Sequence, residues 1–316
     1  KKACFACPIA CGRVTELPDN SKGEGPEYES GWSLGACCGV NDLIAITKAN
    51  FMCNELGLDT ISTGVTIAAA MELFEKGFIP KEDLKNAVEP LFGSSEAVVY
   101  YTKAIAYRKG LGDKLAEGSY RFAAAYGHPE LSMTVKKQEI PAYDPRGVQG
   151  QALQYATSNR GGCHVRGYLI SPEILGVPEK LDPQQLEGKA QWVKIFQDLT
   201  AVIDSAGLCL FTSFALNAQD YCDLINAATG FDFTVEELLK TGERIYNLER
   251  QFNYAAGVSA AEDTLPERFL KDSLPDGAQK GAVAHLDKLL PEYYKARGWD
   301  EKGNLMKEKL AELSLC

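Results

Sequence analysis

The chain alternates between segments with a helical spacing of apolar residues and segments rich in glycine, proline and polar residues. The helical pattern starts at Asp42, which can cap a helix over residues 43–56. Gly57 suits the position after the last turn, because glycine tolerates a positive φ. Apolar spacing or capping residues predict further helices over residues 65–76, 95–109, 113–126 and 189–204. Proline-interrupted helices are expected over residues 265–316.

The most clearly specified helix start is Thr234. Thr234 and Glu237 have the spacing of a capping box, and Phe233 can pack against Leu238 as a hydrophobic staple. The helix should run to about residue 256. Neither a run of alternating strands nor a strand–helix–strand rhythm is present, so the pattern predicts a mainly α fold with two helical lobes.

The middle of the chain has a different character. Residues 128–186 include Pro141, Pro145, Pro172 and Pro178 and the run Asn159–His164 with its two adjacent glycines, which indicates loops, and loops commonly carry functional sites. A domain boundary is therefore expected near residue 133, giving domains of residues 1–133 and 134–316.

Composition narrows the class of protein. The 316 residues suffice for two domains, and the net charge of −10 argues against a nucleic-acid or anionic-membrane surface. No apolar run reaches the roughly 18–20 residues of a membrane span. The ten cysteines are too few for a disulfide scaffold, and three of them gather at one end. This clustering favours metal ligation in a reducing compartment, with the cytoplasm as the default location.

Three of the cysteines form a compact motif. Cys4, Cys7 and Cys11 have C-x2-C-x3-C spacing, with Pro8 and Gly12 suited to a tight loop. A cubane iron–sulfur cluster would need a fourth ligand from elsewhere in the chain. A zinc site and buried structural thiols are the alternatives. Because the motif stands at the start of the sequence, we expect a further domain upstream of it.

A faint internal repeat occurs at a distance of 150 residues. Residues 54–59 (Asn-Glu-Leu-Gly-Leu-Asp) resemble residues 204–209 (Asp-Ser-Ala-Gly-Leu-Cys), and each run follows a predicted helix. Two ordinary glycine-capped helix ends would explain the pattern. Alternatively, the loops face one ligand, because Asx side chains can accept hydrogen bonds from ring N–H groups and glycine permits close approach. Cys209 is then a candidate for the fourth thiolate.

Several motifs in this order resemble the tungsten-dependent aldehyde:ferredoxin oxidoreductases. They are the cysteine loop, Gly-Pro-Glu-Tyr-Glu at residues 25–29, the two repeated loops, Asp-Pro-Arg-Gly at 144–147, Arg-Gly-Gly-Cys-His at 160–164, and Leu-Pro-Glu-Arg, Pro-Glu-Tyr-Tyr and Arg-Gly-Trp-Asp in the tail. The resemblance covers the whole chain but corresponds to the second and third domains of the family. The family's first domain, which holds much of a bis-pterin cofactor, is not part of this sequence.

The resemblance implies a tungsten ion held by two pterins, with molybdenum as a possible substitute, and a nearby [4Fe–4S] cluster. Cys4, Cys7, Cys11 and Cys209 match the cluster ligands of the family. The pterin-binding positions correspond to Asn54, Gly57, Leu58, Asp59, Asp204, Gly207 and Leu208. The sequence departs from the family pattern at Asn54, where the family has aspartate. The amide keeps an acceptor but loses the charge and adds a donor.

The same resemblance implies two groups that move protons. Glu29 and His164 stand where the family has a glutamate and a histidine near the metal, with Glu27 as a rival for the acid/base role. Arg166 could meet a pterin phosphate, because its guanidinium matches phosphate oxygens. The alternatives are a solvated carboxylate, a structural histidine and a surface arginine.

These assignments imply an enzyme that oxidises aldehydes with water to carboxylic acids and passes electrons to ferredoxin or another carrier. A reductase of aromatic acyl-CoA thioesters of the benzoyl-CoA type is an alternative with the same cofactor. A third possibility is a non-catalytic fragment with an empty cofactor site, and the isolated chain is expected to be inactive. The sequence leaves open the aldehyde, the choice of tungsten or molybdenum, and whether a homodimer forms.

Overall fold

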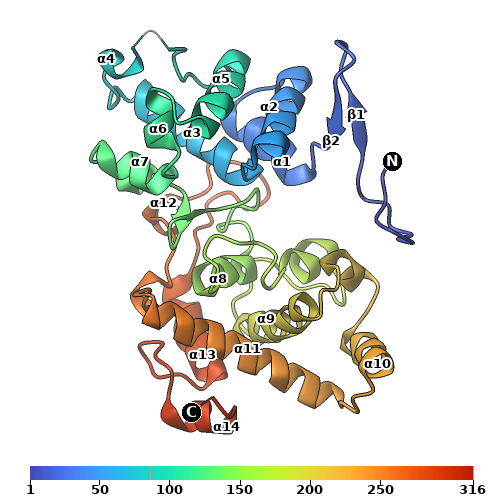
Figure 1. The fold of residues 1–316 in the computed structure, drawn as a ribbon. Helices are drawn as coiled ribbons and strands as arrows, with labels where there is room; N and C mark the ends of the chain where they lie inside the picture. The colour runs from blue at the N-terminus through green and yellow to red at the C-terminus, as the bar shows by residue number, and fades with distance from the viewer. Residues whose placement is uncertain (86, 316) are drawn as a thin grey trace. The chain divides into compact units, whose positions relative to one another are not determined.

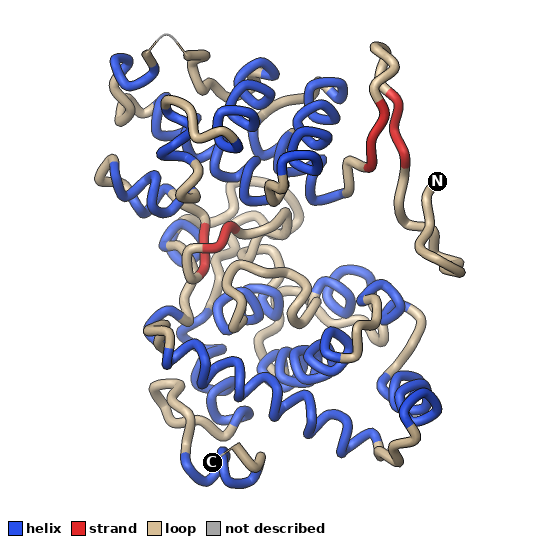
Figure 2. The backbone as a smooth tube through the Cα atoms, in the orientation of Figure 1, coloured by secondary structure: helices blue, strands red, loops and turns tan. Residues whose placement is uncertain are grey.

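The computed structural model describes residues 1–85 and 87–315. The chain folds into two compact units, Lys1–Ala142 and Tyr143–Cys316, each built mainly of helices (Figure 1). In the described residues, strands occur as two short hairpins, drawn in red in Figure 2. The predicted mainly α fold is therefore confirmed. None of the helices in the described ranges combines the length and apolar character that a membrane span requires.

The first unit begins with an antiparallel hairpin and continues as short and medium helices. Its elements are β1 (Val14–Glu16), β2 (Lys22–Glu24), α1 (Tyr28–Leu34), η1 (Ala36–Cys38), α2 (Leu43–Leu56), α3 (Thr60–Glu75), α4 (Lys81–Leu84), α5 (Ser95–Ala106), α6 (Leu111–Leu115), α7 (Ser119–Ala125), η2 (Pro129–Leu131), β3 (Thr134–Val135) and β4 (Gln138–Glu139).

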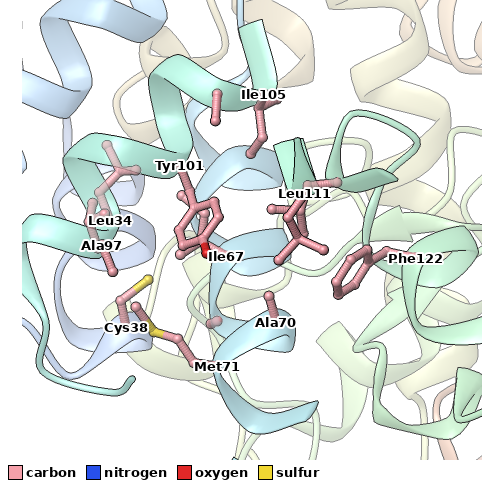
Figure 3. Close-up of a cluster of buried hydrophobic side chains, with 14 of the residues drawn as sticks. Leu34, Cys38, Ile67, Ala70, Met71, Ala97, Tyr101, Ile105, Leu111 and Phe122 are labelled. Carbon is pink, nitrogen blue, oxygen red and sulfur yellow. The ribbon is translucent and has the colours of Figure 1, made fainter. Parts of the chain in front are cut away.

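The core of the first unit surrounds α3. Figure 3 shows Ile67 and Met71 of α3 next to Leu34, Tyr101 and other buried side chains from α1, α5, α6 and α7. The helix is buried along most of its length because its residues are almost all apolar or small. Consequently α3 is the central helix of the unit, and its first residue directly follows the loop of residues 54–59.

Capping explains where the first helices begin and end. The Asp42 side chain accepts hydrogen bonds from the N–H groups of Ile44 and Ala45, and Gly57 closes α2 with φ of 70°. The predicted bounds of α2 are confirmed. The next helix starts earlier than predicted, at Thr60, because Asp59 caps it by accepting from the Ser62 N–H at 2.7 Å.

The single helix predicted over residues 113–126 is wrong. Two helices, α6 and α7, stand in its place, separated at Gly118, which has φ of 85°. The buried Glu139 carboxylate accepts from the N–H of Ser119 at 2.9 Å and from its hydroxyl at 2.8 Å. This carboxylate from the β3–β4 hairpin replaces the hydrogen bonds that a continuous helix would have supplied.

The same hairpin belongs to the first unit. Glu139 also accepts from the hydroxyl of Thr66 at 3.3 Å, which ties β4 to the central helix α3. The two units therefore divide after Ala142, whereas the sequence placed a boundary near residue 133, before the hairpin.

The second unit is built around three long helices. Its elements are α8 (Gln149–Thr157), a π-helical turn η3 (Ser171–Leu175), α9 (Lys189–Ser205), η4 (Leu210–Phe214), α10 (Ala218–Thr229), α11 (Val235–Ala255), η5 (Ala260–Glu262), α12 (Glu267–Lys271), α13 (Leu286–Arg297) and α14 (Lys307–Glu312).

Helix α9 packs against both α11 and α13. The crossing of α9 and α11 is close because Gly242 lies directly against the backbone carbonyl of Asp198, where any side chain would collide. The predicted capping box at Thr234 is confirmed, with Thr234 and Glu237 each accepting from the other's backbone N–H. Phe233 packs on the cluster that contains Leu238, as the staple predicted.

Charged side chains are buried in this unit. Arg297 at the end of α13 is fully buried and forms an ion pair with Asp198 of α9. Its guanidinium carbon lies 4.1 Å from the ring centre of Tyr246. Gln197 and Tyr293 accept further hydrogen bonds from it, at 2.7 and 3.0 Å. A buried cation of this kind needs every partner, because it has left water.

Candidate functional site

The cysteine loop has an unusual backbone. Ala6 and Ala10, the residues immediately before Cys7 and Cys11, have φ of 54° and 49°. Alanine is uncommon in the left-handed region, and unfavourable backbone conformations of this kind cluster at functional sites. Two of them in one short loop therefore mark the cysteine loop as a candidate functional site. The Cys7 N–H donates to the Cys4 carbonyl at 3.1 Å, which tightens the loop around its sulfurs.

The thiols of this loop are accessible. Cys4 and Cys11 are exposed and Cys7 is half-buried, while Phe5 between them is fully exposed. This exposure argues against the alternative of buried structural thiols. Cys38, Cys53, Cys163 and Cys222 are buried instead, and Cys316 lies outside the described residues.

An arginine connects the cysteine loop to the segment that carries the candidate glutamate. Arg13 donates to the carbonyls of Cys11, at 3.4 Å, and Pro26, at 3.0 Å, and to the carboxylate of Glu27, at 3.3 Å. Arg13 was not predicted from the sequence because it belongs to no motif. Its position two residues after Cys11 is the one sequence feature that could have indicated its role.

Glu29 and Glu27 occupy different environments. Glu27 is exposed and paired with Arg13. Glu29, in the first turn of α1, is half-buried and accepts from the Ala142 N–H at 3.0 Å. Burial raises the pKa of Glu29 above its ordinary value, although the Ala142 hydrogen bond acts in the opposite direction. Burial thus favours the protonated form of Glu29, whereas Glu27 is exposed to solvent.

The two repeated loops share one backbone design. Each follows a long helix, α2 or α9, and each turns at a left-handed glycine, Gly57 or Gly207, with φ of 70° in both. The N–H of the next residue, Leu58 or Leu208, then returns to the helix at 2.9 or 3.0 Å. Each loop ends at the N-cap of a further helix, where Asp59 precedes α3 and Cys209 precedes η4.

The polar side chains of the two loops are held differently. The Asn54 amide donates to the carbonyl of Glu24 at 3.1 Å, a bond that an aspartate could not make. Asp59 caps α3, and Asp204 is paired with Arg166. Asn54, Asp59 and Asp204 are all exposed, so each can also face a ligand.

His164 belongs to an aromatic group in the second unit. Its ring centre lies 5.8 Å from that of Tyr143 and 6.0 Å from that of Tyr168, and the two tyrosine hydroxyls are hydrogen-bonded at 2.8 Å. Burial, with a smaller contribution from the charge of Arg160, lowers the pKa of His164 to about 4. The imidazole is therefore neutral at physiological pH. Tyr143 and Tyr168 were not predicted from the sequence, because they lie 25 positions apart and no motif relates them to His164.

This pKa predicts a pH-dependent loss of stability. The unfolded imidazole titrates at about 6.5 and the folded one at about 4, so between these values the unfolded chain binds more protons and stability falls as the pH falls. Between pH 7 and pH 4.5, the free energy of unfolding of the parent should drop by roughly 2–3 kcal/mol more than that of His164→Gln. Urea denaturation at the two pH values measures the difference, and parallel losses in parent and variant would contradict it.

Arg166 lies between two carboxylates. It forms ion pairs with Asp204, at 2.6 Å, and with Glu249 of α11. Glu249 was not predicted from the sequence, because it lies 83 positions from Arg166 and only the fold brings the two together.

The candidate residues are distributed over both units. Cys4, Cys7, Cys11, Glu29 and the loop of residues 54–59 belong to the first unit, and His164, Arg166 and the loop of residues 204–209 belong to the second. Within the part of the chain that the structure describes, no three or more His, Cys, Asp or Glu side chains gather closely enough to hold a single metal ion.

The sequence matches a known protein family along almost its whole length. The family profile described as "Aldehyde ferredoxin oxidoreductase, domains 2 & 3" matches residues 1–315. The chain belongs to the aldehyde ferredoxin oxidoreductase family. This confirms the resemblance that the motifs indicated.

Two members of the aldehyde ferredoxin oxidoreductase family are closely similar. The chain is 60% identical to a tungsten-containing aldehyde ferredoxin oxidoreductase of Pyrococcus furiosus, over 100% of this chain and 52% of that protein. A protein of the same name from Thermococcus kodakarensis is 58% identical, over 99% of this chain and 52% of its own length. The chain thus spans about half the length of the curated relatives it matches.

A solved structure has the same fold. It is the active-site complex of benzoyl coenzyme A reductase with 1,5-dienoyl-CoA, with a TM-score of 0.81 over 99% of this chain and 52% of that chain. At 21% sequence identity, this likeness concerns the fold alone.

The aldehyde ferredoxin oxidoreductase relatives are named as tungsten-containing, and the motif resemblance implies a tungsten–pterin group that the loops of this chain fit. A side-chain carbon added at Gly57 or Gly207 would meet no atom within 4 Å, so open space adjoins both backbones. The carboxylates and amide beside these glycines can accept hydrogen bonds from the N–H groups of a pterin ring. The accessible thiols of Cys4, Cys7 and Cys11 in the first unit are donors of the kind that an iron–sulfur cluster uses, and Cys209 in the second unit is a further exposed thiol.

Proposed function

We propose that this chain is the C-terminal portion of a tungsten–pterin oxidoreductase that oxidises aldehydes with water to carboxylic acids. Electrons would pass through a [4Fe–4S] cluster to ferredoxin or another carrier. The observation that carries the proposal is the pair of matching loops, residues 54–59 and 204–209, in a chain that belongs to the aldehyde ferredoxin oxidoreductase family. The activity, the substrate and the electron carrier are parts of the proposal.

In this proposal, each loop holds one pterin. Asn54, Gly57, Leu58 and Asp59 would serve the first, and Asp204, Gly207 and Leu208 the second. Cys4, Cys7, Cys11 and Cys209 would ligate the cluster. Cys209 thus ends a pterin loop and begins the cluster site. The bound tungsten–pterin group supplies the two-electron chemistry and the metal centre at which the aldehyde is oxidised.

The chain itself supplies the groups that hold and move protons. Oxidation of an aldehyde by water releases protons, so a nearby acceptor assists the reaction. Glu29 has a raised pKa because it is buried, and it can take up a proton at a higher pH than an exposed glutamate. His164 is neutral above about pH 4 and can accept a hydrogen bond or a proton without carrying charge beforehand.

Metal and activity measurements on the full-length protein test this function. We expect tungsten, or molybdenum in its place, together with iron and acid-labile sulfide, and aldehyde-dependent reduction of a viologen dye. Cys209→Ser should lower the iron content and the visible absorbance, whereas Cys222→Ala, at a buried thiol that contacts the Phe233 carbonyl, should retain both. A full-length protein without tungsten or molybdenum would contradict the proposal.

An acyl-CoA reductase is the second candidate, and the fold likeness to the benzoyl coenzyme A reductase complex supports it. The 60% identity to an aldehyde ferredoxin oxidoreductase favours the first candidate. The same dye assay separates the two: reduced dye consumed by benzoyl-CoA, without turnover of aldehydes, would favour the reductase. Residues 1–316 alone are expected to be inactive with either substrate.

A further inference from the structure

The guanidinium of Arg166 is engaged by the chain itself. One terminal nitrogen pairs with Asp204 at 2.6 Å, and the other pairs with Glu249. The three side chains are partly shielded from water, with exposures of 19% for Arg166, 38% for Asp204 and 29% for Glu249. Burial works against the charge of Arg166, but the two carboxylates outweigh it and raise the pKa of the arginine. These two pairs favour a role in holding the chain over the direct phosphate contact that the sequence suggested.

Helix α11 forms the fixed side of this arrangement. The Asn159 amide donates to Glu249 at 3.3 Å and to the Tyr246 carbonyl at 2.9 Å. Asn253, one turn further along α11, donates to the Asn159 carbonyl at 2.8 Å. Because α11 also packs tightly on α9, both ends of the loop over residues 159–166 are tied to a well-packed helix.

Asp204 forms the other side of the arrangement. It lies in the last turn of α9, and its carbonyl accepts from the Gly207 N–H at 3.1 Å. The backbone of Asp204 therefore sets the glycine turn, while its exposed carboxylate is oriented by Arg166. Without Arg166, that carboxylate would be free to rotate at the end of a helix whose C-terminal dipole repels it.

We propose that Arg166 is a positioning residue that clamps the Asp204 carboxylate for the second pterin, and so couples the loop of His164 to the loop of Gly207 and Cys209. The proposal rests on the proposed function, since it assigns Asp204 to a pterin. It gives Arg166 no contact with the cofactor. The residues around a ligating group commonly change affinity about 10–100-fold when they are removed.

The first unit provides an internal comparison. Asn54 stands at the position that matches Asp204, and it is held by a neutral hydrogen bond to the Glu24 carbonyl. No ion pair of Asn54 is possible, so a change at Arg166 should leave the loop of residues 54–59 unaffected.

The test uses the full-length protein with Arg166→Gln, Arg166→Lys, Asp204→Asn and the double variant Arg166→Gln/Asp204→Asn. Two readouts are measured: tungsten retained per chain after gel filtration, and backbone hydrogen exchange at residues 206–209 and 54–59. Arg108→Gln is the matched control, because Arg108 also bridges two carboxylates, Asp113 and Glu117, but on an exposed surface of the first unit.

We expect Arg166→Gln to reduce the retained tungsten roughly tenfold and to speed up exchange at residues 206–209 while residues 54–59 stay unchanged. Arg166→Lys, which keeps the charge but cannot bridge both carboxylates, should give an intermediate loss. Because Arg166 acts through Asp204, the double variant should retain as much tungsten as Asp204→Asn alone. Arg108→Gln should match the parent in both readouts.

Three results would overturn the clamp. In the first, the tungsten losses of the two single variants multiply in the double variant, which would indicate a direct contact of Arg166 with the cofactor. In the second, Arg166→Gln leaves both the retained tungsten and the hydrogen exchange unchanged. In the third, Arg108→Gln loses as much tungsten as Arg166→Gln. A parent protein without tungsten or molybdenum would overturn the proposed function instead, and the exchange at residues 206–209 would then decide the clamp by itself. Arg166→Lys keeps the test valid if Arg166→Gln fails to fold.

Discussion

Replacing Glu29 by glutamine in the full-length protein is expected to lower kcat by about 10²–10⁴-fold without removing tungsten or iron. Glutamine keeps the size of the side chain and an acceptor oxygen for the Ala142 N–H, so the local structure should persist. What the variant loses is the ability to take up a proton. Steady-state dye reduction with an aldehyde, together with metal analysis, measures both parts of this expectation.

The pH profile gives a second readout for Glu29. A carboxylate that accepts a proton is active when ionised, so the rate should fall as the pH drops through its pKa. Because burial raises that pKa, the fall should begin at a higher pH than an ordinary exposed glutamate would give. This acidic limb should be absent from the residual activity of Glu29→Gln.

Glu27→Gln is the matched control for this position. Glu27 lies two residues away, is exposed and pairs with Arg13, so its loss should leave most of the activity and the acidic limb in place. Full activity in Glu29→Gln, or a severe loss in Glu27→Gln alone, would reverse the two assignments.

Replacing Asp198 by asparagine should destabilise the second unit by about 3–5 kcal/mol. The variant leaves the fully buried Arg297 without a carboxylate partner among the described residues. Tyr246, Tyr293 and Gln197 remain around the guanidinium, but they provide polar and π contacts and no negative charge. Chemical denaturation, followed by tryptophan fluorescence, measures the loss, since Trp299 contributes to the signal and its ring centre lies 5.9 Å from the guanidinium carbon of Arg297.

An exposed ion pair provides the control for Asp198. Glu267 and Lys271 form a pair on α12 with exposures of 71% and 65%, so Glu267→Gln makes the same change of acid to amide at the surface. Its cost should be below about 1 kcal/mol. Adding Arg297→Met to Asp198→Asn should recover part of the loss, since the unpaired charge is then gone. If Asp198→Asn lowers the free energy of unfolding no more than Glu267→Gln does, the aromatic rings around Arg297 are sufficient to stabilise its buried charge.

The elements that the sequence predicted well are those whose signals are local. Asp42 and Gly57 define α2, and Thr234 defines the start of α11, because caps and boxes act within one helical turn. The break between α6 and α7 was missed because its cause, Glu139, lies twenty positions downstream of Ser119. The contact of Glu139 with Ser119 and Thr66 likewise joins the β3–β4 hairpin to the first unit, a long-range contact that the sequence pattern does not show.

The candidate site shows the same division. Motif spacing named the cysteine loop and the two repeated loops, and the family resemblance named Glu29 and His164, but neither could name the residues that hold them. Arg166 reaches Asp204 across 38 positions and Glu249 across 83, contacts that exist only in the folded chain. The left-handed Ala6 and Ala10 also escaped notice, because alanine carries no signal for a positive φ.

The two repeated loops, residues 54–59 and 204–209, end at equivalent positions, so one backbone turn carries two different side chains. Asp59 and Cys209 both stand at the N-cap of the following helix, after the same glycine turn. The side chain at that position therefore differs, a carboxylate in one loop and a thiol in the other, while the surrounding backbone turn is the same. The same backbone turn can therefore present a carboxylate in one unit and a thiol in the other without any change of architecture.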